Sequence, residues 1–314
     1  MTQNNLRNLR MAFVFPGQGS QSPGMGKDLA ENFPVARQVF EEADDALGFA
    51  ISRLCFDGPA EDLQLTENTQ PAILTVSVAV YRVLRESGID APAFVAGHSL
   101  GEYSALVAAG SLSLSDAVRT VRARGRYMQE AVPVGTGAMA AAIGGELEAI
   151  ERICAEASQG QVCSIANINA PNQVVIAGNA EAVDRAVELL SGVARKVVKL
   201  KVSAPFHCAL MKPAQDRLAV DLEALNFSEP EMPVVTNVDA RATTAPDELR
   251  DALVRQVSAP VRWVESMQLL IDHGVEQLVE AGPGKVLSGL MRQINRDVQM
   301  LNVEDAASLQ KLSN

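Results

Sequence analysis

The sequence FVAGHSLGEYSALVAA, residues 94–109, places a serine in a glycine-flanked turn between two different patterns. Phe94–Ala96 is a short apolar run typical of a buried strand, and Glu102–Ala109 is typical of a helix that stops at Gly110. The turn itself matches G-x-S-x-G, in which a sharp bend lifts the serine hydroxyl clear of the sheet. An ordinary glycine-rich turn would also fit these letters. The strand before it and the helix after it favour Ser99 as a nucleophile, with the N–H of Leu100 directed at a developing oxyanion.

The same alternation of short apolar runs and helical patterns extends in both directions from this turn. On the N-terminal side, Ala12–Phe15 predicts a strand, and helices follow around 32–47 and 70–87, with Pro71 in the first turn of the second. On the C-terminal side, the pattern predicts helices at 210–225, 247–257, 263–272 and 286–294 and strands at 233–237, 275–280 and 300–303. A polar tail follows the last strand. Such strand–turn–helix units indicate an α/β fold with a mainly parallel sheet.

The middle of the chain has a different order of elements. Strands are predicted at 138–143, 162–166, 174–177 and 196–202, with helices at 146–157 and 181–190. This β-α-β-β-α-β order is the ferredoxin-like pattern, and it begins after the hinge-like stretch 133–137. We therefore expect a small ferredoxin-like domain, residues 133–205, inserted into a discontinuous large domain made of residues 1–132 and 206–314.

Composition limits the classes of function. The 314 residues are 47% hydrophobic, enough for a large core, and the net charge of −11 argues against nucleic acid or an anionic membrane as the main partner. The apolar runs are too short to span a bilayer, and residues 1–10 lack the apolar core of a signal peptide. The four cysteines and three histidines show no metal-ligand spacing. We expect a cytoplasmic protein with free thiols and no metal site.

A serine nucleophile needs a base, and the chain offers three histidines. His98 is adjacent to Ser99 and would project away from it on a tight turn. His273 lies at a helix end before Gly274, where a role at the helix terminus explains it. His207 remains by elimination as the candidate base, and a core or capping histidine is the alternative reading of that position.

No acid in a convincing position completes a triad with Ser99 and His207. The order found in α/β-hydrolases would require an acid between the two, largely within the inserted domain. We expect a main-chain carbonyl, or an amide side chain such as that of Gln256, to hold the imidazole instead. Either is a weaker orienting group than a carboxylate.

Arg124 interrupts the apolar face of a helix whose start is predicted by a capping box at Ser113 and Asp116. It shares that face with Ala117, Val121 and Met128, whereas Arg119 and Arg126 lie on the opposite face. An unpaired guanidinium there would be costly to bury. Arg124 therefore needs an anion, which is either an internal Asp or Glu or a bound carboxylate held in a bidentate fork.

The glycine-rich turn at residues 15–21, FPGQGSQ, contains the first two glycines of the dinucleotide-binding motif G-x-G-x-x-G. The third glycine is missing because position 22 is Ser22, and no ribose-binding acid follows at a convincing spacing. A dinucleotide site is therefore disfavoured. An alternative role for these glycines is to present the N–H of Gln18 as a second oxyanion donor.

Five motifs occur together in one order: FPGQGSQ at 15–21, TQPA at 69–72, GHSLGEY at 97–103, RGRYM at 124–128 and GPGKVL at 282–287. Over residues 11–303 the chain resembles the bacterial malonyl-CoA:acyl carrier protein transacylases, and ordered motifs are far more specific than G-x-S-x-G alone. The resemblance implies an α/β-hydrolase-like core with a ferredoxin-like insert. It also implies transfer of a malonyl group from malonyl-CoA to the phosphopantetheine thiol of acyl carrier protein for fatty acid synthesis, with the CoA thioester as substrate and no cofactor.

The resemblance also assigns roles to individual positions of this sequence. It implies the nucleophile Ser99, the base His207, the malonyl-carboxylate clamp Arg124, the main-chain oxyanion donors Gln18 and Leu100, the carbonyl of Gln256 that orients the histidine, and a cleft asparagine, Asn169. An acidic carrier protein would need a local basic surface on this acidic chain, for which the candidates are Arg195, Lys196, Lys199 and Lys201, or Lys285 and Arg292. A solvated face is the alternative reading of those charges.

Two other functions remain possible from the sequence. The first is a serine hydrolase, either a thioesterase or a carboxylesterase, on a similar core. A hydrolase of neutral esters has no reason to bury a guanidinium in its acyl pocket, so Arg124 argues against it. The second is a non-catalytic module that binds carrier protein, which loss of Ser99 or His207 would indicate; both residues are present.

Overall fold

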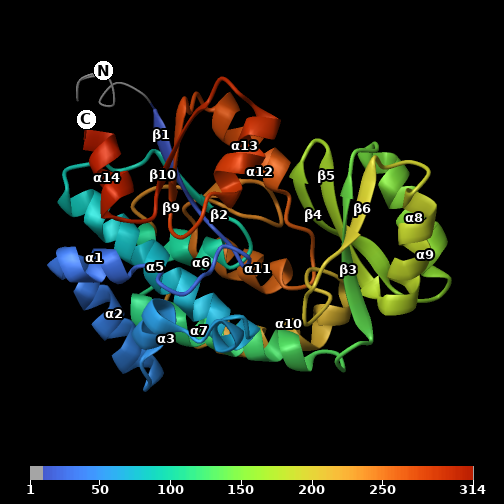
Figure 1. The fold of residues 1–314 in the computed structure, drawn as a ribbon, viewed down its shortest axis with the longest axis horizontal. Coiled ribbons are helices and arrows are strands. Elements are labelled where there is room, and N and C mark those ends of the chain that lie inside the picture. The colour runs from blue at the N-terminus through green and yellow to red at the C-terminus, as the bar shows by residue number, and fades with distance from the viewer. Residues whose placement is uncertain (1–9, 314) are drawn as a thin grey trace.

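The computed structural model describes residues 10–313, which form a larger part built around one sheet and a smaller part with its own sheet beside it (Figure 1). Within these residues, none of the helices is both long enough and apolar enough to cross a membrane. The expectation that residues 1–10 contain no signal peptide falls almost wholly outside the described residues.

Within residues 10–313 the larger sheet has six strands. Across the sheet their order is β10 (Gln299–Val303), β9 (Gln277–Ala281), β1 (Met11–Phe15), β2 (Phe94–Gly97), β7 (Val234–Val235) and β8 (Ala242–Thr243). The pairs from β10 to β7 are parallel, and the edge pair β7–β8 is antiparallel. The predicted mixed α/β architecture with a mainly parallel sheet is therefore confirmed.

Helices cover both faces of this sheet. They are α1 (Lys27–Asn32), α2 (Pro34–Leu47), α3 (Ile51–Asp57), α4 (Ala60–Leu63), α5 (Thr66–Glu86), α6 (Gly101–Ala108), α7 (Leu114–Glu130), α10 (Lys212–Glu223), α11 (Pro246–Gln256), α12 (Trp263–Asp272), α13 (Val286–Ile294) and α14 (Ala306–Ser313), with a 3-10 turn at Ala209–Met211. Successive side chains of a strand point to opposite faces. Phe13 and Phe15 of β1 thus pack in the core that includes α2, α5, α6 and α7, whereas Ala12 and Val14 pack in the core that includes α12 and α13.

The smaller part carries an antiparallel sheet of four strands within the described residues. Its elements along the chain are β3 (Gly137–Ile143), α8 (Leu147–Ser158), β4 (Cys163–Ala170), β5 (Gln173–Asn179), α9 (Ala180–Leu190) and β6 (Lys196–Lys199). Their spatial order is β4-β5-β3-β6, and α8 and α9 pack on the sheet through a core that includes Ile150 and Ile176. The predicted order of elements in this segment matches the observed one.

The edge strand β4 also contacts the larger part. The N–H of Ile168 donates a hydrogen bond to the oxygen of Val261 at 2.9 Å, and the N–H of Val261 donates one to the oxygen of Ala166, also at 2.9 Å. These main-chain bonds hold β4 against the loop before α12. The two parts are therefore joined by more than the two chain crossings.

Two predictions about single elements were wrong. Helix α5 starts at Thr66, so Pro71 lies inside it rather than in its first turn. Tertiary packing explains the longer helix, because α5 approaches α7 so closely that a Cβ on Gly125 would lie 2.6 Å from the oxygen of Thr66. The predicted polar tail forms α14, whose Leu309 and Leu312 are buried in the core.

Candidate active site

Ser99 lies at the turn between β2 and α6 in a left-handed backbone conformation, with a φ of +52°. This conformation is strained for a residue with a side chain and is typical of a nucleophile on a sharp turn. The flanking glycines are required by space. A Cβ on Gly97 would lie 1.9 Å from main-chain atoms of Gly101, and one on Gly101 would lie 2.2 Å from the oxygen of Phe15. The turn is therefore compact and brings the end of β1 against the start of α6.

His207 follows β6, lies just before the 3-10 turn that leads into α10, and is 4% exposed. Its Nε2 is 2.7 Å from the Oγ of Ser99, and its Nδ1 donates a hydrogen bond to the main-chain oxygen of Gln256 at 2.9 Å. The second bond assigns the proton to Nδ1 and leaves Nε2 as the acceptor that faces the serine. Burial, followed by the positive charge of Arg124, lowers the pKa of His207 to about 3, so the ring is neutral near pH 7.

Arg124, on α7, is 2% exposed. It contacts Ser99 and Gln256, the two residues that His207 also contacts. Its Nη1 donates to Oε1 of Gln70 at 2.7 Å, and its Nη2 donates to Oε1 of Gln256 at 2.9 Å and to Oγ of Ser99 at 3.2 Å. Among residues 10–313 its guanidinium forms no ion pair with an Asp or Glu, and its Nε has no hydrogen-bond partner. Of the two alternatives that the sequence left open, an internal acid is not found in the described part of the chain. Neutral amides hold a cation that remains available to an anion.

Two main-chain N–H groups border the serine. Those of Gln18 and Leu100 have no acceptor among the residues that the structure describes, and both residues line the same cavity as Ser99. Gly17 allows the loop that carries Gln18 to approach the loop that carries Leu100, because a Cβ on Gly17 would lie 2.5 Å from the main-chain oxygen of His98. Since Leu100 also precedes the first turn of α6, the helix dipole adds to the attraction for negative charge. This pair of donors is suited to stabilise an oxyanion.

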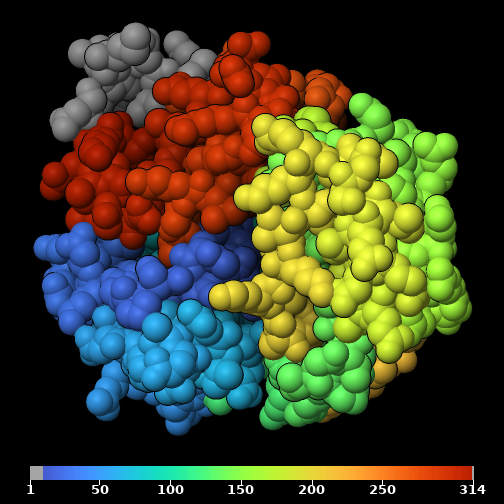
Figure 2. All heavy atoms as spheres, turned by 45° about the vertical axis from the view of Figure 1, so that its right-hand side comes forward, coloured from blue at the N-terminus to red at the C-terminus, as the bar shows by residue number. Residues whose placement is uncertain are grey.

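These groups surround a cavity of about 150 Å³ between the two parts. Its wall consists of Gln18, Gln70, His98, Ser99, Leu100, Arg124, Met128, Met139, Asn167, Leu200, Val202, Phe206 and His207. Met139, Asn167, Leu200 and Val202 come from the smaller part or its return segment. Figure 2 shows the segment near residue 200, in yellow, along the boundary between the red and blue surface of the larger part and the green surface of the smaller one.

Asn169 lies beside this cavity without forming its wall. Its Oδ1 is 2.8 Å from Nε2 of His98, whose ring centroid is 5.4 Å from that of Trp263. His98 thus contacts Asn169 of the smaller part and Trp263 of the larger part while it also borders the cavity. Asn167, two residues earlier on β4, is the asparagine that lines the cavity.

Three polar residues at the site received no role from the sequence. Gln70 contacts Arg124, as above, and Glu102 lies fully buried on α6. Asn237 accepts the N–H of Ser99 on its Oδ1 at 2.7 Å and donates from Nδ2 to the oxygen of Gly97 at 2.7 Å. Gln70 lies in the TQPA motif and Glu102 in the GHSLGEY motif, so their motifs were the feature of the sequence that could have pointed to them. No local pattern marks Asn237.

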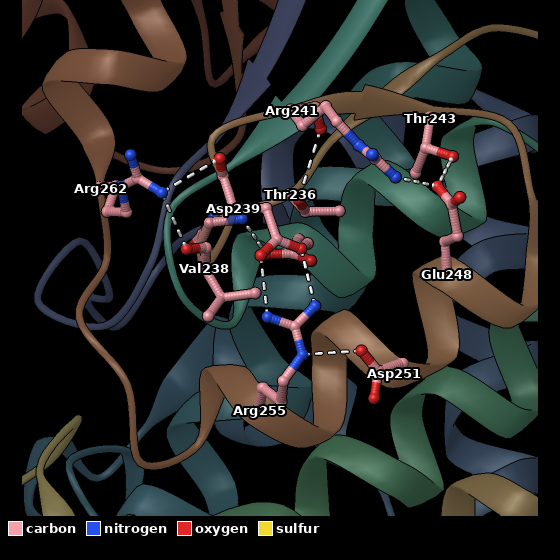
Figure 3. Close-up of polar contacts among 11 residues, drawn as sticks. Thr236, Val238, Asp239, Arg241, Thr243, Glu248, Asp251, Arg255 and Arg262 are labelled. Carbon is pink, nitrogen blue, oxygen red and sulfur yellow. Dashed lines mark hydrogen bonds and ion pairs between the residues drawn. The ribbon is translucent and has the colours of Figure 1, made fainter.

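The turn that presents Asn237 is held by charged residues (Figure 3). Arg255 forms a two-pronged contact with the carboxylate of Asp239, at 2.8 and 2.7 Å, and a further contact with Asp251 at 2.7 Å. Arg262 donates to the main-chain oxygens of Val238 and Asp239 at 3.4 and 3.2 Å. Exposed ion pairs contribute little stability individually. Here the Arg255–Asp239 pair and the two hydrogen bonds from Arg262 converge on one short turn next to the site.

Residues 10–313 contain no group of three or more His, Cys, Asp or Glu side chains placed to hold a metal ion. The four cysteines are buried and unpaired. The chemistry that the described groups support is nucleophilic attack by Ser99 with His207 as proton acceptor, two oxyanion donors and a buried cation in the same cavity.

Comparison with known proteins gives consistent matches. Residues 12–313 match the acyl transferase domain family. A malonyl CoA-acyl carrier protein transacylase of Escherichia coli strain K12 is 54% identical over 286 residues, which cover 91% of this chain and 93% of that protein. The corresponding Bacillus subtilis strain 168 protein is 48% identical over 303 residues, covering 96% and 95%.

Solved structures agree with these matches. An acyl carrier protein S-malonyltransferase from Vibrio cholerae has a TM-score of 0.95 at 51% identity, covering 96% of this chain and 99% of that one. A malonyl-transacylase in complex with its type II PKS acyl-carrier protein has a TM-score of 0.94 at 51% identity, covering 96% and 98%.

Proposed function

The chain belongs to the acyl transferase family, and on that premise we propose that it transfers the malonyl group of malonyl-CoA to the phosphopantetheine thiol of acyl carrier protein through a malonyl-serine intermediate. This reaction supplies malonyl groups for fatty acid synthesis, and we place it in the cytoplasm. The substrates are a CoA thioester and a carrier protein, and the reaction needs no further cofactor.

A single observation carries the proposal. The Oγ of Ser99 lies 2.7 Å from Nε2 of His207 and 3.2 Å from Nη2 of Arg124, in one cavity. A nucleophile that contacts both a base and a buried cation, itself without an Asp or Glu partner among residues 10–313, suits an acyl group whose far end is a carboxylate.

In the first half-reaction, Oγ of Ser99 attacks the thioester carbon while its proton moves to Nε2 of His207. The main-chain N–H groups of Gln18 and Leu100 stabilise the resulting oxyanion, each by about 3 kcal/mol. When the tetrahedral intermediate collapses, the C–S bond breaks and the sulfur takes the proton from His207. CoA leaves as a thiol, and the malonyl ester of Ser99 remains.

The second half-reaction is the reverse with a new thiol. The phosphopantetheine thiol gives its proton to His207 as its sulfur attacks the ester carbon. The C–O bond to Ser99 then breaks, and His207 returns the proton to the serine oxygen. Because the carbonyl of Gln256 fixes Nδ1 of the ring, Nε2 stays directed at the reacting atoms throughout.

Arg124 selects the acyl group and also affects the base. Its charge is one cause of the low pKa of His207, so pairing the guanidinium with the malonyl carboxylate weakens that effect and raises the pKa. Binding of an acidic acyl group thus makes His207 a stronger base at the moment it is needed. A hydrolase of neutral esters would gain nothing from this arrangement.

We further propose that residues 1–132 and 206–314 form an α/β-hydrolase-like catalytic domain and that residues 133–205 form a ferredoxin-like insert. The parallel sheet with Ser99 at a strand-to-helix turn supports the first assignment. The β-α-β-β-α-β element order and the antiparallel sheet support the second. The cavity then lies between the two domains, where both can contact substrate.

The test is intact-mass analysis after mixing the protein with malonyl-CoA and quenching. We expect a malonyl adduct that Ser99→Ala abolishes. We also expect the adduct to discharge onto acyl carrier protein much faster than onto water. Rapid hydrolysis without carrier protein would support the hydrolase instead.

A further inference from the structure

Glu102 is a buried acid next to the nucleophile turn that the mechanism above does not use. It lies on the first turn of α6 and is 0% exposed. Among residues 10–313 it has no ion-pair partner within 4 Å. Burial raises the pKa of Glu102 to about 7, which reflects the cost of keeping a carboxylate there. The hydrogen bonds of its carboxylate indicate what this buried acid does.

One oxygen of Glu102 makes all of its hydrogen bonds. Oε2 accepts the main-chain N–H of Asn237 at 2.9 Å and Nε2 of Gln256 at 2.9 Å. Oε1 has no partner within the described part of the chain. The carboxylate therefore bridges the turn that holds the N–H of Ser99 and the side chain that contacts Arg124.

The contact with Gln256 determines which way its amide faces. Nε2 of Gln256 donates to Glu102 and also to the main-chain oxygen of Ser99 at 3.0 Å. The main-chain oxygen of Ser99 only accepts, and Oε2 of Glu102 already accepts the N–H of Asn237, so the NH2 group faces them and Oε1 faces the guanidinium of Arg124, 2.9 Å away. The reversed amide would place an oxygen against two oxygens and an NH2 group against a cation.

Gln256 in turn contacts both Arg124 and His207. Its side-chain oxygen holds Arg124, and its main-chain oxygen holds Nδ1 of His207. On the basis of the malonyl transfer proposed above, we propose that Glu102 is a positioning residue: its carboxylate locks the Gln256 amide and thereby aims Arg124 at the malonyl carboxylate. Glu102 contacts neither the acyl group nor the reacting atoms.

The experiment compares two variants of Glu102 in the full-length protein. Glu102→Met fills a similar volume but cannot accept the two hydrogen bonds, whereas Glu102→Gln keeps an oxygen that can. For each, kcat and KM are measured with malonyl-CoA and with acetyl-CoA, which has no carboxylate for Arg124. Thermal unfolding is recorded in parallel. Glu280→Gln is the matched control, because Glu280 is equally buried and bonds to Leu287 and Ser288 away from the site.

We expect Glu102→Met to lower kcat/KM for malonyl-CoA about 100-fold, because a small misplacement of the Arg124 guanidinium costs about that much. For acetyl-CoA, which has no carboxylate for Arg124, we expect a loss of about tenfold. The preference for malonyl should return to near the wild-type value in Glu102→Gln and stay unchanged in Glu280→Gln. If Glu102 acts through Gln256, the double variant Glu102→Met, Gln256→Ala should show no lower preference than Gln256→Ala alone.

Equal fractional losses for both thioesters in a folded Glu102→Met variant would overturn the proposal, as would additive losses in the double variant. If Glu102→Met does not fold, Gln256→Ala decides, since an unchanged malonyl preference in that variant also overturns it. Absence of the malonyl adduct on the wild-type protein would instead refute the proposed function. The two failures are therefore distinguishable.

Discussion

Nη2 of Arg124 donates a hydrogen bond to Oγ of Ser99 at 3.2 Å, so the proposed acyl-selecting cation and the proposed nucleophile are in direct contact. Arg124 also stacks near the ring of Tyr103, 5.8 Å from its centroid, and its remaining partners are the amides of Gln70 and Gln256. Uncharged partners position a guanidinium without neutralising it. On the proposed function, the malonyl carboxylate supplies the counterion that the described residues do not.

Removing this cation should change acyl selectivity. Arg124→Ala deletes a charge-assisted fork to the malonyl carboxylate, so we expect kcat/KM for malonyl-CoA to fall about 100-fold. Transfer from acetyl-CoA should fall much less. Steady-state kinetics with both thioesters measure the ratio, and Arg126→Ala, on the exposed face of the same helix, is the control. Equal losses for malonyl and acetyl would contradict the clamp.

The same cation should control the pH dependence. In the free protein the pKa of His207 lies at about 3, so kcat/KM should stay flat as pH falls from 8 to 5 instead of dropping near the ordinary histidine pKa of 6.5. Arg124→Met removes one of the causes that lower the pKa of His207 and leaves burial and the charge of His98, so the acidic limb of the profile should move to higher pH yet remain below 6.5. Acetyl-CoA is the substrate for this profile, because it does not need the clamp.

Two outcomes of the pH profile are informative. An acidic limb that stays in place in Arg124→Met would mean that the charge of Arg124 does not lower the pKa of His207. A wild-type limb near pH 6.5 would mean that the base is not depressed at all. Arg126→Met again serves as control, with the wild-type profile expected.

Asn237 should support the nucleophile without affecting selectivity. Asn237→Ala leaves the N–H of Ser99 and the oxygen of Gly97 unpaired in a buried position, which we expect to cost about 2–4 kcal/mol of unfolding free energy. The strained turn should loosen, so kcat should fall by the same factor for malonyl and acetyl. Denaturant unfolding and steady-state kinetics measure the two effects. The control is Asn295→Ala, which removes an exposed side-chain bond to the N–H of Asp297.

A shift in the malonyl-to-acetyl ratio in Asn237→Ala would show that Asn237 acts on the clamp as well. Full stability and full activity would show that water replaces its two bonds.

The sequence pointed to a site residue where the pattern that suggests it lies within one short stretch of the chain. Ser99 could be proposed as the nucleophile because a strand, a turn and a helix surround it within sixteen residues. Arg124 could be proposed as a binding residue because a single arginine interrupts an apolar helix face. His207 could be reached only by elimination among three histidines, since its contact with Ser99 spans 108 positions.

The partners of these residues could not be predicted, because tertiary packing decides them. Asn237 meets Ser99 from 138 residues away, through a turn whose placement depends on β7 and on the contacts of Arg255 and Arg262. The sequence around Arg124 likewise could not show whether its partner is an internal acid or a bound carboxylate. Two amides from α5 and α11 occupy the positions that an internal acid would take.

The oxyanion donors depend on a close approach of two loops, and Gly17 tests it. A Cβ at Gly17 would lie 2.5 Å from the main-chain oxygen of His98, so Gly17→Ala must push the Gln18 loop away from Leu100. Losing one donor costs about 3 kcal/mol of transition-state stabilisation, and we expect kcat to fall about 100-fold for malonyl and acetyl alike. Gly289→Ala is the matched control, because a Cβ on that helical glycine meets nothing within 4 Å. Single-turnover acylation followed by intact mass measures the step directly, and an unchanged rate in Gly17→Ala would remove Gln18 from the oxyanion hole.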